Sequence, residues 1–281
     1  MNPRTPSHGT RRRLLSALAL SPLALGATAF AAPTPEDKLR AAVDGPQRSA
    51  ANRARDGARH PYETLAFFGL RPDAQVIEIA PGGGWYTEIL AAYLSPKGRL
   101  YAAHEPAEGS PGQQRARKAF ADKLVADPAT YGRVVLGTLP VERFTDIHPP
   151  GGADAVLTFR NIHNWISDGH FDETLRAFFA VLKPGGVLGV EEHRALPGTS
   201  LSQVIASGYV PQDFVVDRAR AAGFRLAAIS EINANPRDTH DHARGVWSLP
   251  PTLRGGEVDR AKYLAIGESD RMTLRFVKPA R

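Results

Sequence analysis

The chain has 281 residues, a formal net charge of +6 and no cysteine. Without cysteine it can form no disulfide, thiolate metal site, cysteine nucleophile or lipoprotein anchor, and it is compatible with an oxidising compartment. Residues 1–31 hold four arginines and no acidic residue, so the remaining 250 residues carry a net charge of only +2. This charge gives no indication of a nucleic-acid-binding surface. A length of 250 residues suits one domain with additions.

Residues 1–31 have the successive zones of an export signal. Arginines 11–13 precede an apolar run at residues 17–30, and Ala29-Phe30-Ala31 supplies small residues for cleavage. The paired arginines resemble a twin-arginine signal, which a receptor reads. The apolar run is too short and too interrupted for a comfortable transmembrane span. We therefore expect the twin-arginine export machinery as a partner, cleavage near Ala31, a periplasmic location and no stable membrane insertion.

Residues 32–70 predict a helical N-terminal extension. Helices are expected from Pro35, over Ser49–Arg59 and from Pro61 to Gly69. The segment Arg55–Glu63 concentrates charged and aromatic residues just ahead of the first predicted strand. It is either a solvated helix face or a lid over a substrate pocket.

The stretch Val76–Glu88 organises the rest of the chain. Val76 to Ala80 predicts a buried strand, Gly82–Gly84 a tight turn, and a helix follows from about Trp85. Three consecutive glycines allow the backbone to approach a ligand closely, which is typical of nucleotide-type crevices in open α/β sheets. A dinucleotide fingerprint would need glycines at positions 80, 82 and 85, and two of these fail.

Strand and helix alternate through residues 71–281. Further strands are expected over Arg99–His104, Arg133–Leu136, Ala153–Thr158, Val187–Glu191, Phe224–Ile232 and Met272–Val277, and further helices over 110–125, 171–182 and 211–222. This alternation predicts an α/β fold, a Rossmann-like doubly wound, mostly parallel sheet of seven strands with helices on both faces. Residues 233–270 are too long for a hairpin and predict a cap-like insertion beside a substrate pocket.

Two groups of polar residues follow the predicted strands. Glu105 lies 21 residues past Gly84, where an acid can accept hydrogen bonds from ribose hydroxyls. Asn161 and His163 lie in a polar and aromatic stretch, Phe159–Trp165, which has no evident secondary structure and follows the strand next to the glycine turn. They are candidate catalytic residues, His163 as a general base. The alternatives are a helix N-cap for Asn161 and a structural role for His163.

Two further groups have weaker signals. Glu191 and Glu192 are adjacent at a strand end, so at most one of them faces the ligand crevice. The loop residues Asp238–His242 include two histidines and two aspartates, which could ligate a metal. Such residues on a loop are usually solvated, and we expect no metal site.

The glycine stretch resembles the Glu/Asp-x-Gly-x-Gly-x-Gly motif of class I S-adenosylmethionine-dependent methyltransferases. Glu78, Ala80, Gly82 and Gly84 stand in its places, and only the first glycine departs, to Ala80. The turn Leu182–Gly186 before the fifth strand is also recurrent in that fold. The chain further resembles an uncharacterised bacterial branch of predicted methyltransferases, through the motifs at residues 59–65, 81–88, 160–165 and 267–272.

The resemblance implies S-adenosylmethionine as the cofactor and methyl transfer to a small or medium-sized acceptor. Glu78 and the backbone from Ala80 through Gly83 to Gly84 would hold the amino-acid part of the cofactor, and Glu105 the ribose. Thr138 stands where the family often has an acid that contacts adenine. The alternatives are a periplasmic protein that binds the cofactor without catalysis and, less in keeping with Ala80 and Trp85, an NAD-linked oxidoreductase.

Overall fold

The computed structural model describes residues 1–3, 32–139, 147 and 149–280. The chain divides into two compact units, Met1–Ala32 and Pro33–Arg281. Every helix and strand named below belongs to the second unit. The predicted export signal lies, apart from residues 1–3, outside the described residues and stays a prediction.

The described part of the second unit contains one seven-stranded sheet. Its strands, with the order β3-β2-β1-β4-β5-β7-β6, are β1 (Gln75–Ile79), β2 (Arg99–His104), β3 (Val135–Thr138), β4 (Ala153–Phe159), β5 (Leu182–His193), β6 (Arg225–Ser230) and β7 (Arg271–Val277). β7 runs antiparallel to β5 and β6, and the other neighbours pair in parallel. The predicted doubly wound, mostly parallel sheet is confirmed.

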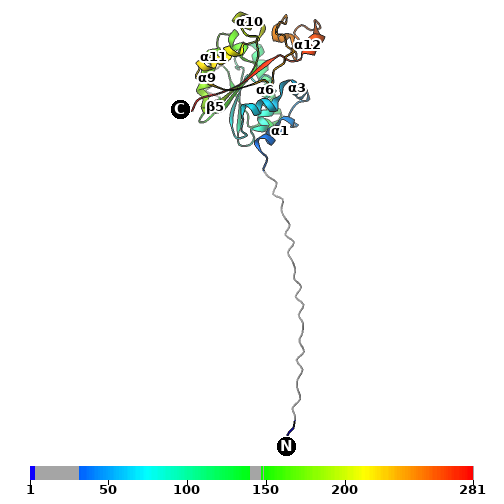
Figure 1. Ribbon diagram of the computed structural model, residues 1–281, viewed down its shortest axis with the longest axis vertical. Coiled ribbons are helices and arrows are strands. Elements are labelled where there is room, and N and C mark those ends of the chain that lie inside the picture. The colour runs from blue at the N-terminus through cyan, green and yellow to red at the C-terminus, as the bar shows by residue number, and fades with distance from the viewer. Residues whose placement is uncertain (4–31, 140–146, 148, 281) are drawn as a thin grey trace. The chain divides into compact units, whose positions relative to one another are not determined.

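Helices cover both faces of the sheet (Figure 1). They are α1 (Pro35–Asp44), α2 (Ala50–Arg53), α3 (Asp56–Arg59), α4 (Pro61–Phe68), α5 (Thr87–Tyr93), α6 (Pro111–Ala126), α7 (Pro128–Tyr131), α8 (Ile162–Ser167), α9 (Phe171–Val181), α10 (Leu201–Ser207), α11 (Gln212–Ala221), the 3₁₀ helix η2 (Gly245–Ser248) and α12 (Arg260–Ile266).

Two hydrophobic cores follow from the alternation of side chains along the strands. Ile77 of β1 faces a core shared with α9 and α11. Its neighbour Val76 faces a second core shared with α1, α4 and α5. Successive side chains of a strand point to opposite faces, so an apolar strand such as β1 must be covered on both sides.

Several predicted boundaries are wrong, among them that of β5, which begins at Leu182 and not at Val187. Two others have clear local reasons. The helix expected over Ser49–Arg59 is broken into α2 and α3, because Arg55 has φ −100° and ψ −1°, outside regular helical geometry. β3 starts two residues later than expected, because the Val134 amide bonds the Tyr131 carbonyl and closes a turn there. Its pairing with β2 therefore begins at Val135.

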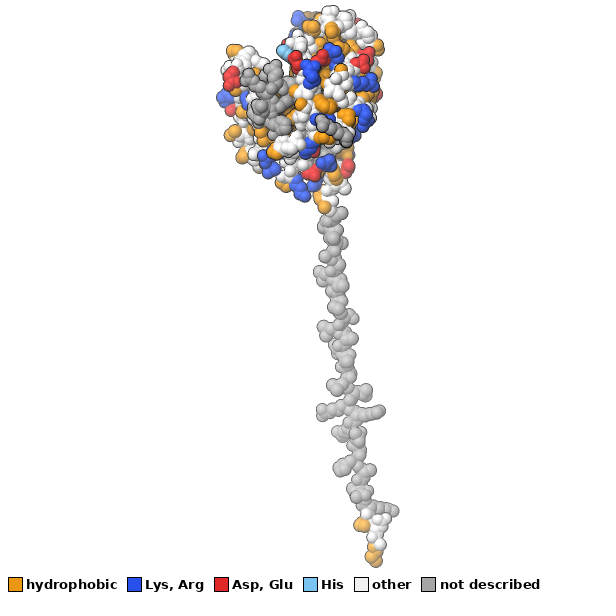
Figure 2. All heavy atoms as spheres, turned by 90° about the vertical axis from the view of Figure 1, so that its left-hand side faces the viewer, with side chains coloured by type: hydrophobic (Ala, Val, Ile, Leu, Met, Phe, Trp, Pro, Cys, Tyr) orange, Lys and Arg blue, Asp and Glu red, His pale blue; other side chains and the backbone are white. Residues whose placement is uncertain are grey.

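The long connection between β6 and β7 carries η2 and α12. Leu249, Tyr263 and Ile266 form a small separate core within it. Among the described residues, no helix has the length and apolar character needed to cross a membrane. On the face drawn in Figure 2, basic and acidic side chains are interspersed.

Candidate functional site

The glycine turn leaves open space above its backbone. Gly82 and Gly83 are exposed, and a Cβ atom added to either would have no heavy atom within 4 Å. Their amide nitrogens have no hydrogen-bond partner among the described residues. Gly84 has a left-handed φ of 82°, so the turn ends there. α5 begins at Thr87 with Tyr86 at its N-cap, two residues later than expected. The backbone of the turn is therefore open on this side, although Gly82–Gly84 are not among the residues that line the cleft described below.

The residue that replaces the first glycine of the motif adopts a glycine-like conformation. Ala80 has φ 45°, and its amide bonds the Ala103 carbonyl at 2.8 Å. A left-handed alanine costs about 1–2 kcal/mol, which the surrounding strands must supply. The motif geometry is therefore kept without the glycine.

Side chains from β2 and α6 hold the turn from below. His104 bonds the Gly82 carbonyl through Nε2 at 3.1 Å, and its Nδ1 accepts the Glu105 amide, so Nε2 carries the proton. Lys123 donates to the Gly83 carbonyl at 3.0 Å and pairs with Glu88 at 2.8 Å. These bonds fix the carbonyls and leave the opposite side of the turn free.

Glu78 lies beneath the turn and is fully buried. Its Oε2 accepts a 2.6 Å hydrogen bond from the Thr87 hydroxyl at the start of α5. Burial raises its pKa to about 7, although Thr87 and the charge of Lys123 act to lower it. Glu78 does not line the cleft described next, and its contact with Thr87 ties β1 to α5.

A cleft of about 540 Å³ opens at the carboxyl ends of β1, β2 and β4. Such a volume suits a nucleotide-sized ligand, and the position is the usual binding crevice of an open α/β sheet. Three of the predicted site residues line it: Ala80, Glu105 and Asn161. Asn164 and Trp165, from the polar and aromatic stretch that the sequence indicated, also line it. The lining that the sequence did not indicate includes Gln113, Leu139, Asp168, His170 and Glu173.

The Glu105 carboxylate is held at the wall of this cleft. Its Oε2 accepts a 2.8 Å hydrogen bond from Gln113 of α6, and Oε1 has no partner among the described residues. Arg117 donates to the Glu105 carbonyl at 2.9 Å. The side chain is thus oriented by α6 and keeps acceptor capacity for a ligand.

Thr138 is the last residue of β3 and is half-buried. It lies opposite His104 of β2, but the next residue, Leu139, lines the cleft in its place. The contact predicted between Thr138 and adenine stays a prediction.

The segment after β4 contains a short helix, which the sequence did not indicate. Asn161 occupies the N-cap position of α8 but makes no side-chain cap. Its Nδ2 instead donates to the Ile79 carbonyl at 3.2 Å and to Thr158 at 3.3 Å. Asn161 therefore joins the ends of β1 and β4 at the wall of the cleft.

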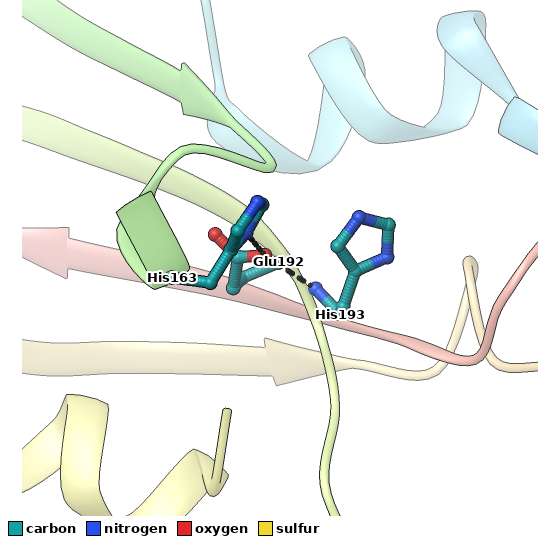
Figure 3. A group of neighbouring side chains, drawn as sticks. All are labelled: His163, Glu192 and His193. Atoms are coloured by element: carbon teal, nitrogen blue, oxygen red, sulfur yellow. Dashed lines mark hydrogen bonds and ion pairs between the residues drawn. The ribbon is translucent and has the colours of Figure 1, made fainter. Parts of the chain in front are cut away.

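α8 separates the two predicted catalytic residues. With 3.6 residues per turn, Asn161, Asn164 and Trp165 share the face that lines the cleft. His163 lies on the other face, where its Nδ1 is 3.0 Å from Oε1 of the buried Glu192 (Figure 3). A carboxylate there makes Nδ1 the donor and leaves Nε2 as the acceptor. His163 is therefore oriented as a base, but outside the cofactor-sized cleft.

His193 completes a group with His163 and Glu192. Each of the three offers one potential metal-ligating atom, and these atoms lie within 4.8 Å of one another. The imidazole of His193 bonds Ser269 through Nδ1 at 2.5 Å. Burial and the positive charges of neighbouring arginines, among them Arg160, hold its pKa well below its usual value. The same arginines disfavour a divalent cation at this position.

No protein-family profile and no curated protein matches this sequence. Solved structures do match. A SAM-dependent methyltransferase from Aquifex aeolicus has a TM-score of 0.53 and 15% identity, over 86% of this chain and 98% of that chain. An arsenic(III) S-adenosylmethionine methyltransferase from Chlamydomonas reinhardtii has a TM-score of 0.50 and 16% identity, over 88% and 74%. The [4+2]-cyclase SpnF has a TM-score of 0.56 and 17% identity, over 89% and 98%.

The chain has the class I methyltransferase fold. At these sequence identities the likeness establishes the fold alone. It confirms the fold that the resemblance of the glycine motif predicted. The activity of each matched protein belongs to that protein.

Within the class I methyltransferase fold, a buried group of charges lies beside the glycine turn. We call it the arginine cluster, and its members are Arg55, Arg59, Arg160, Glu191, Glu268 and Arg271. Its two carboxylates are fully engaged by guanidinium groups. Glu268 accepts from Arg55, Arg59 and Arg271, and Glu191 from Arg160, Arg271 and the Tyr86 hydroxyl.

The arginine cluster joins segments that are far apart in the sequence. Arg59 contacts Glu268 across 209 residues, and Arg59 also lies over the Trp85 ring at 4.9 Å. Although burial alone would raise it, the charges of Arg271, Arg160 and Arg59 hold the pKa of Glu191 below its usual value. Arg59, in the segment 55–63, is therefore buried in the arginine cluster and is not a solvated surface residue, whereas the lid over a substrate pocket stays a prediction.

The loop considered for a metal is packed against the fold at Asp238 and His242, whereas Thr239 and Asp241 are exposed. Asp238 and His242 are buried, and His242 Nε2 bonds Asp238 at 2.8 Å. Asp238 also accepts from the Tyr209 hydroxyl and from the backbone amides of His240 and Asp270. With its oxygens engaged by these donors, Asp238 fastens the insertion to the strands.

Proposed function

We propose that this chain is an S-adenosylmethionine-dependent methyltransferase that acts on a small or medium-sized acceptor. The observation that carries the proposal is the cleft of about 540 Å³ at the carboxyl ends of β1, β2 and β4, lined by Ala80, Glu105 and Asn161. The class I methyltransferase fold supports it. The open backbone of the glycine turn and the free acceptor of Glu105 are chemically suited to this cofactor.

The residues present would share the work of binding. The free amides of Gly82 and Gly83 would receive the polar amino-acid end, and Glu105 would accept hydrogen bonds from the ribose hydroxyls. When bound, the cofactor supplies an activated methyl group on a sulfonium. The protein then needs mainly to align the acceptor with that methyl group and to exclude water.

His163 is the residue proposed to take a proton from the acceptor. Glu192 holds its Nδ1, so the lone pair of Nε2 is available, as in other carboxylate-oriented histidine bases. The neutral His193 and Trp247, whose rings lie 5.4 Å and 6.0 Å from that of His163, bound the same space. An acceptor there would lie on the other side of α8 from the adenine end of the cleft.

A second candidate is a protein that binds the cofactor without transferring a methyl group. The likeness to a [4+2]-cyclase favours keeping it, because the same fold carries another chemistry there. Calorimetry with S-adenosylmethionine, S-adenosylhomocysteine and NAD distinguishes the cofactors. Release of S-adenosylhomocysteine separates an enzyme from a binder, and mass spectrometry of a copurifying ligand would identify the acceptor class. Tight binding of NAD alone would contradict both candidates.

We predict that Glu105→Ala weakens S-adenosylmethionine binding by about 1–3 kcal/mol, the cost of losing a charged hydrogen-bond partner. Calorimetry on the purified variant measures this change. Glu108→Ala is the matched control, since Glu108 is an exposed acid of the same loop that does not line the cleft. Equal affinity of Glu105→Ala and the parent would show that another group binds the ribose.

We further propose a periplasmic location, reached through the twin-arginine machinery. Changing Arg11 and Arg12 together to Lys is expected to leave the precursor in the cytoplasm, because the receptor reads the motif and not the charge. Fractionation and immunoblotting measure the exported share, with Arg4→Lys as the control. Export of the double variant at the parental rate would assign the general secretory route.

A further inference from the structure

The arginine cluster has more positive than negative charge. It contains four guanidinium groups and two carboxylates, and the side chains of Arg59 and Arg271 are almost fully buried. Arg48 and Lys123 pair with Asp56 and Glu88 and balance them, whereas the buried carboxylate of Glu192, next to Glu191, offsets part of the surplus. The remaining positive charge lies on the partly exposed side chains of Arg55 and Arg160, where it favours an anionic partner from solution.

The cluster also keeps donors that no protein group uses. Among the described residues, Nη1 and Nη2 of Arg59 and Nε and Nη2 of Arg160 have no hydrogen-bond acceptor. Nε of Arg271 is buried without a partner. The side chain of Arg160 is 19% exposed, so a small molecule can reach it. A planar guanidinium with two free nitrogens matches a carboxylate or phosphate oxyanion.

The backbone at Arg160 is strained. Its φ is 62°, in the left-handed region that non-glycine residues seldom occupy. The conformation is held by a 2.7 Å bond from the Arg160 amide to the Glu191 carbonyl and by the ion pair of the two side chains. Strain that is fixed from two directions is typical of functional positions.

The position of Arg160 connects this site with the cofactor cleft. The next residue, Asn161, lines the cleft, and His163 follows on the far face of α8. Arg59 lies over Trp85, directly after the glycine turn. A group bound by the two arginines would therefore lie near the end of β4, next to a residue that lines the cofactor cleft.

We propose that Arg59 and Arg160 bind an oxyanion, a carboxylate or a phosphate, carried by the methyl acceptor. That the bound molecule is a methyl acceptor rests on the proposed methyltransferase function, whereas the oxyanion site itself rests on the arginine cluster. The acceptor is then an anionic small molecule whose charged group is fixed by the guanidinium groups while its reacting atom faces the methyl donor.

The test is calorimetry on the full chain in a buffer without phosphate. S-adenosylhomocysteine, inorganic phosphate and acetate are titrated separately, and the two anions also at saturating S-adenosylhomocysteine. The variants are Arg160→Asn, whose asparagine tolerates the left-handed backbone, and Arg59→Gln. The matched control is Arg194→Gln, since Arg194 spends Nε, Nη1 and Nη2 on Asp270 and Glu231 and has no free donor nitrogen. Thermal unfolding checks that each variant folds.

We expect the parent to bind phosphate or acetate, and the stronger of the two identifies the oxyanion class. Both cluster variants should lose at least about tenfold in anion affinity, with S-adenosylhomocysteine affinity changed less than about twofold, and the control should match the parent. A parent that binds neither anion would overturn the proposal. Equal losses of anion affinity and S-adenosylhomocysteine affinity in the two cluster variants would also overturn it, because the arginines would then bind the cofactor's own carboxylate. Anion binding without S-adenosylhomocysteine binding would contradict the proposed function and leave the oxyanion site standing.

Discussion

Gly83→Val is expected to abolish S-adenosylmethionine binding and to leave the fold intact. Gly83 lies outside the left-handed region of φ, and a Cβ atom there meets nothing within 4 Å, so the folded protein has room for the side chain. A ligand bound against the turn would have no room, because the added methyl groups would occupy the space it needs. Calorimetry and thermal unfolding on one preparation measure both parts of the prediction.

The neighbouring glycines cannot replace Gly83 in this test. Gly82 and Gly84 have left-handed φ values of 57° and 82°, so valine there strains the backbone whether or not a ligand binds. Gly255→Val is the matched control, since Gly255 also lies outside that region, in the insertion and away from the turn. Micromolar affinity retained by Gly83→Val would exclude the glycine turn from the binding site.

The sheet was predictable because its signals are local. An apolar strand, a glycine turn and a following helix predict β1 and its crossover, and short apolar runs predict the other parallel strands. The errors lie where a single backbone angle decides, as at Arg55, which breaks the expected helix. The helix α8 was missed because its six residues hold too short a pattern to separate from a polar loop.

The site was predictable only where one segment supplies it. Glu105 was found from its spacing to the glycine turn, and the structure places it in the cleft. No spacing rule could bring Arg59 to Glu268, because their contact depends on how β7 and the N-terminal helices pack. At Asp238 the sequence predicted a solvated loop residue and no metal site, and the structure buries this side chain. Its histidine-rich neighbourhood suggests a metal, but its buried partner Tyr209 decides its role.

His163→Ala is expected to lower turnover on the true acceptor by about 10²–10⁴-fold and to leave S-adenosylmethionine affinity nearly unchanged. A base acts on the acceptor in the transition state, and His163 does not line the cofactor-sized cleft. Some stability must also be lost, about 1–3 kcal/mol, because the buried Glu192 loses the donor at 3.0 Å. The first effect is measured as S-adenosylhomocysteine released per folded molecule. An extract fraction with which the parent releases S-adenosylhomocysteine serves as the source of acceptor. Thermal unfolding measures the second effect.

The stability loss makes a matched control necessary, and the chain offers one in His242. It is also a buried histidine paired with a buried carboxylate, at 2.8 Å from Asp238, but it belongs to the insertion and contacts neither the cleft nor Glu192. His242→Ala should therefore lower the unfolding temperature by a comparable amount and keep turnover per folded molecule. Because the two variants lose the same kind of interaction, any difference in their turnover reports the chemistry of His163. A His163→Ala protein that is destabilised but as active per folded molecule as His242→Ala would mean that His163 only holds α8 to β5 through Glu192.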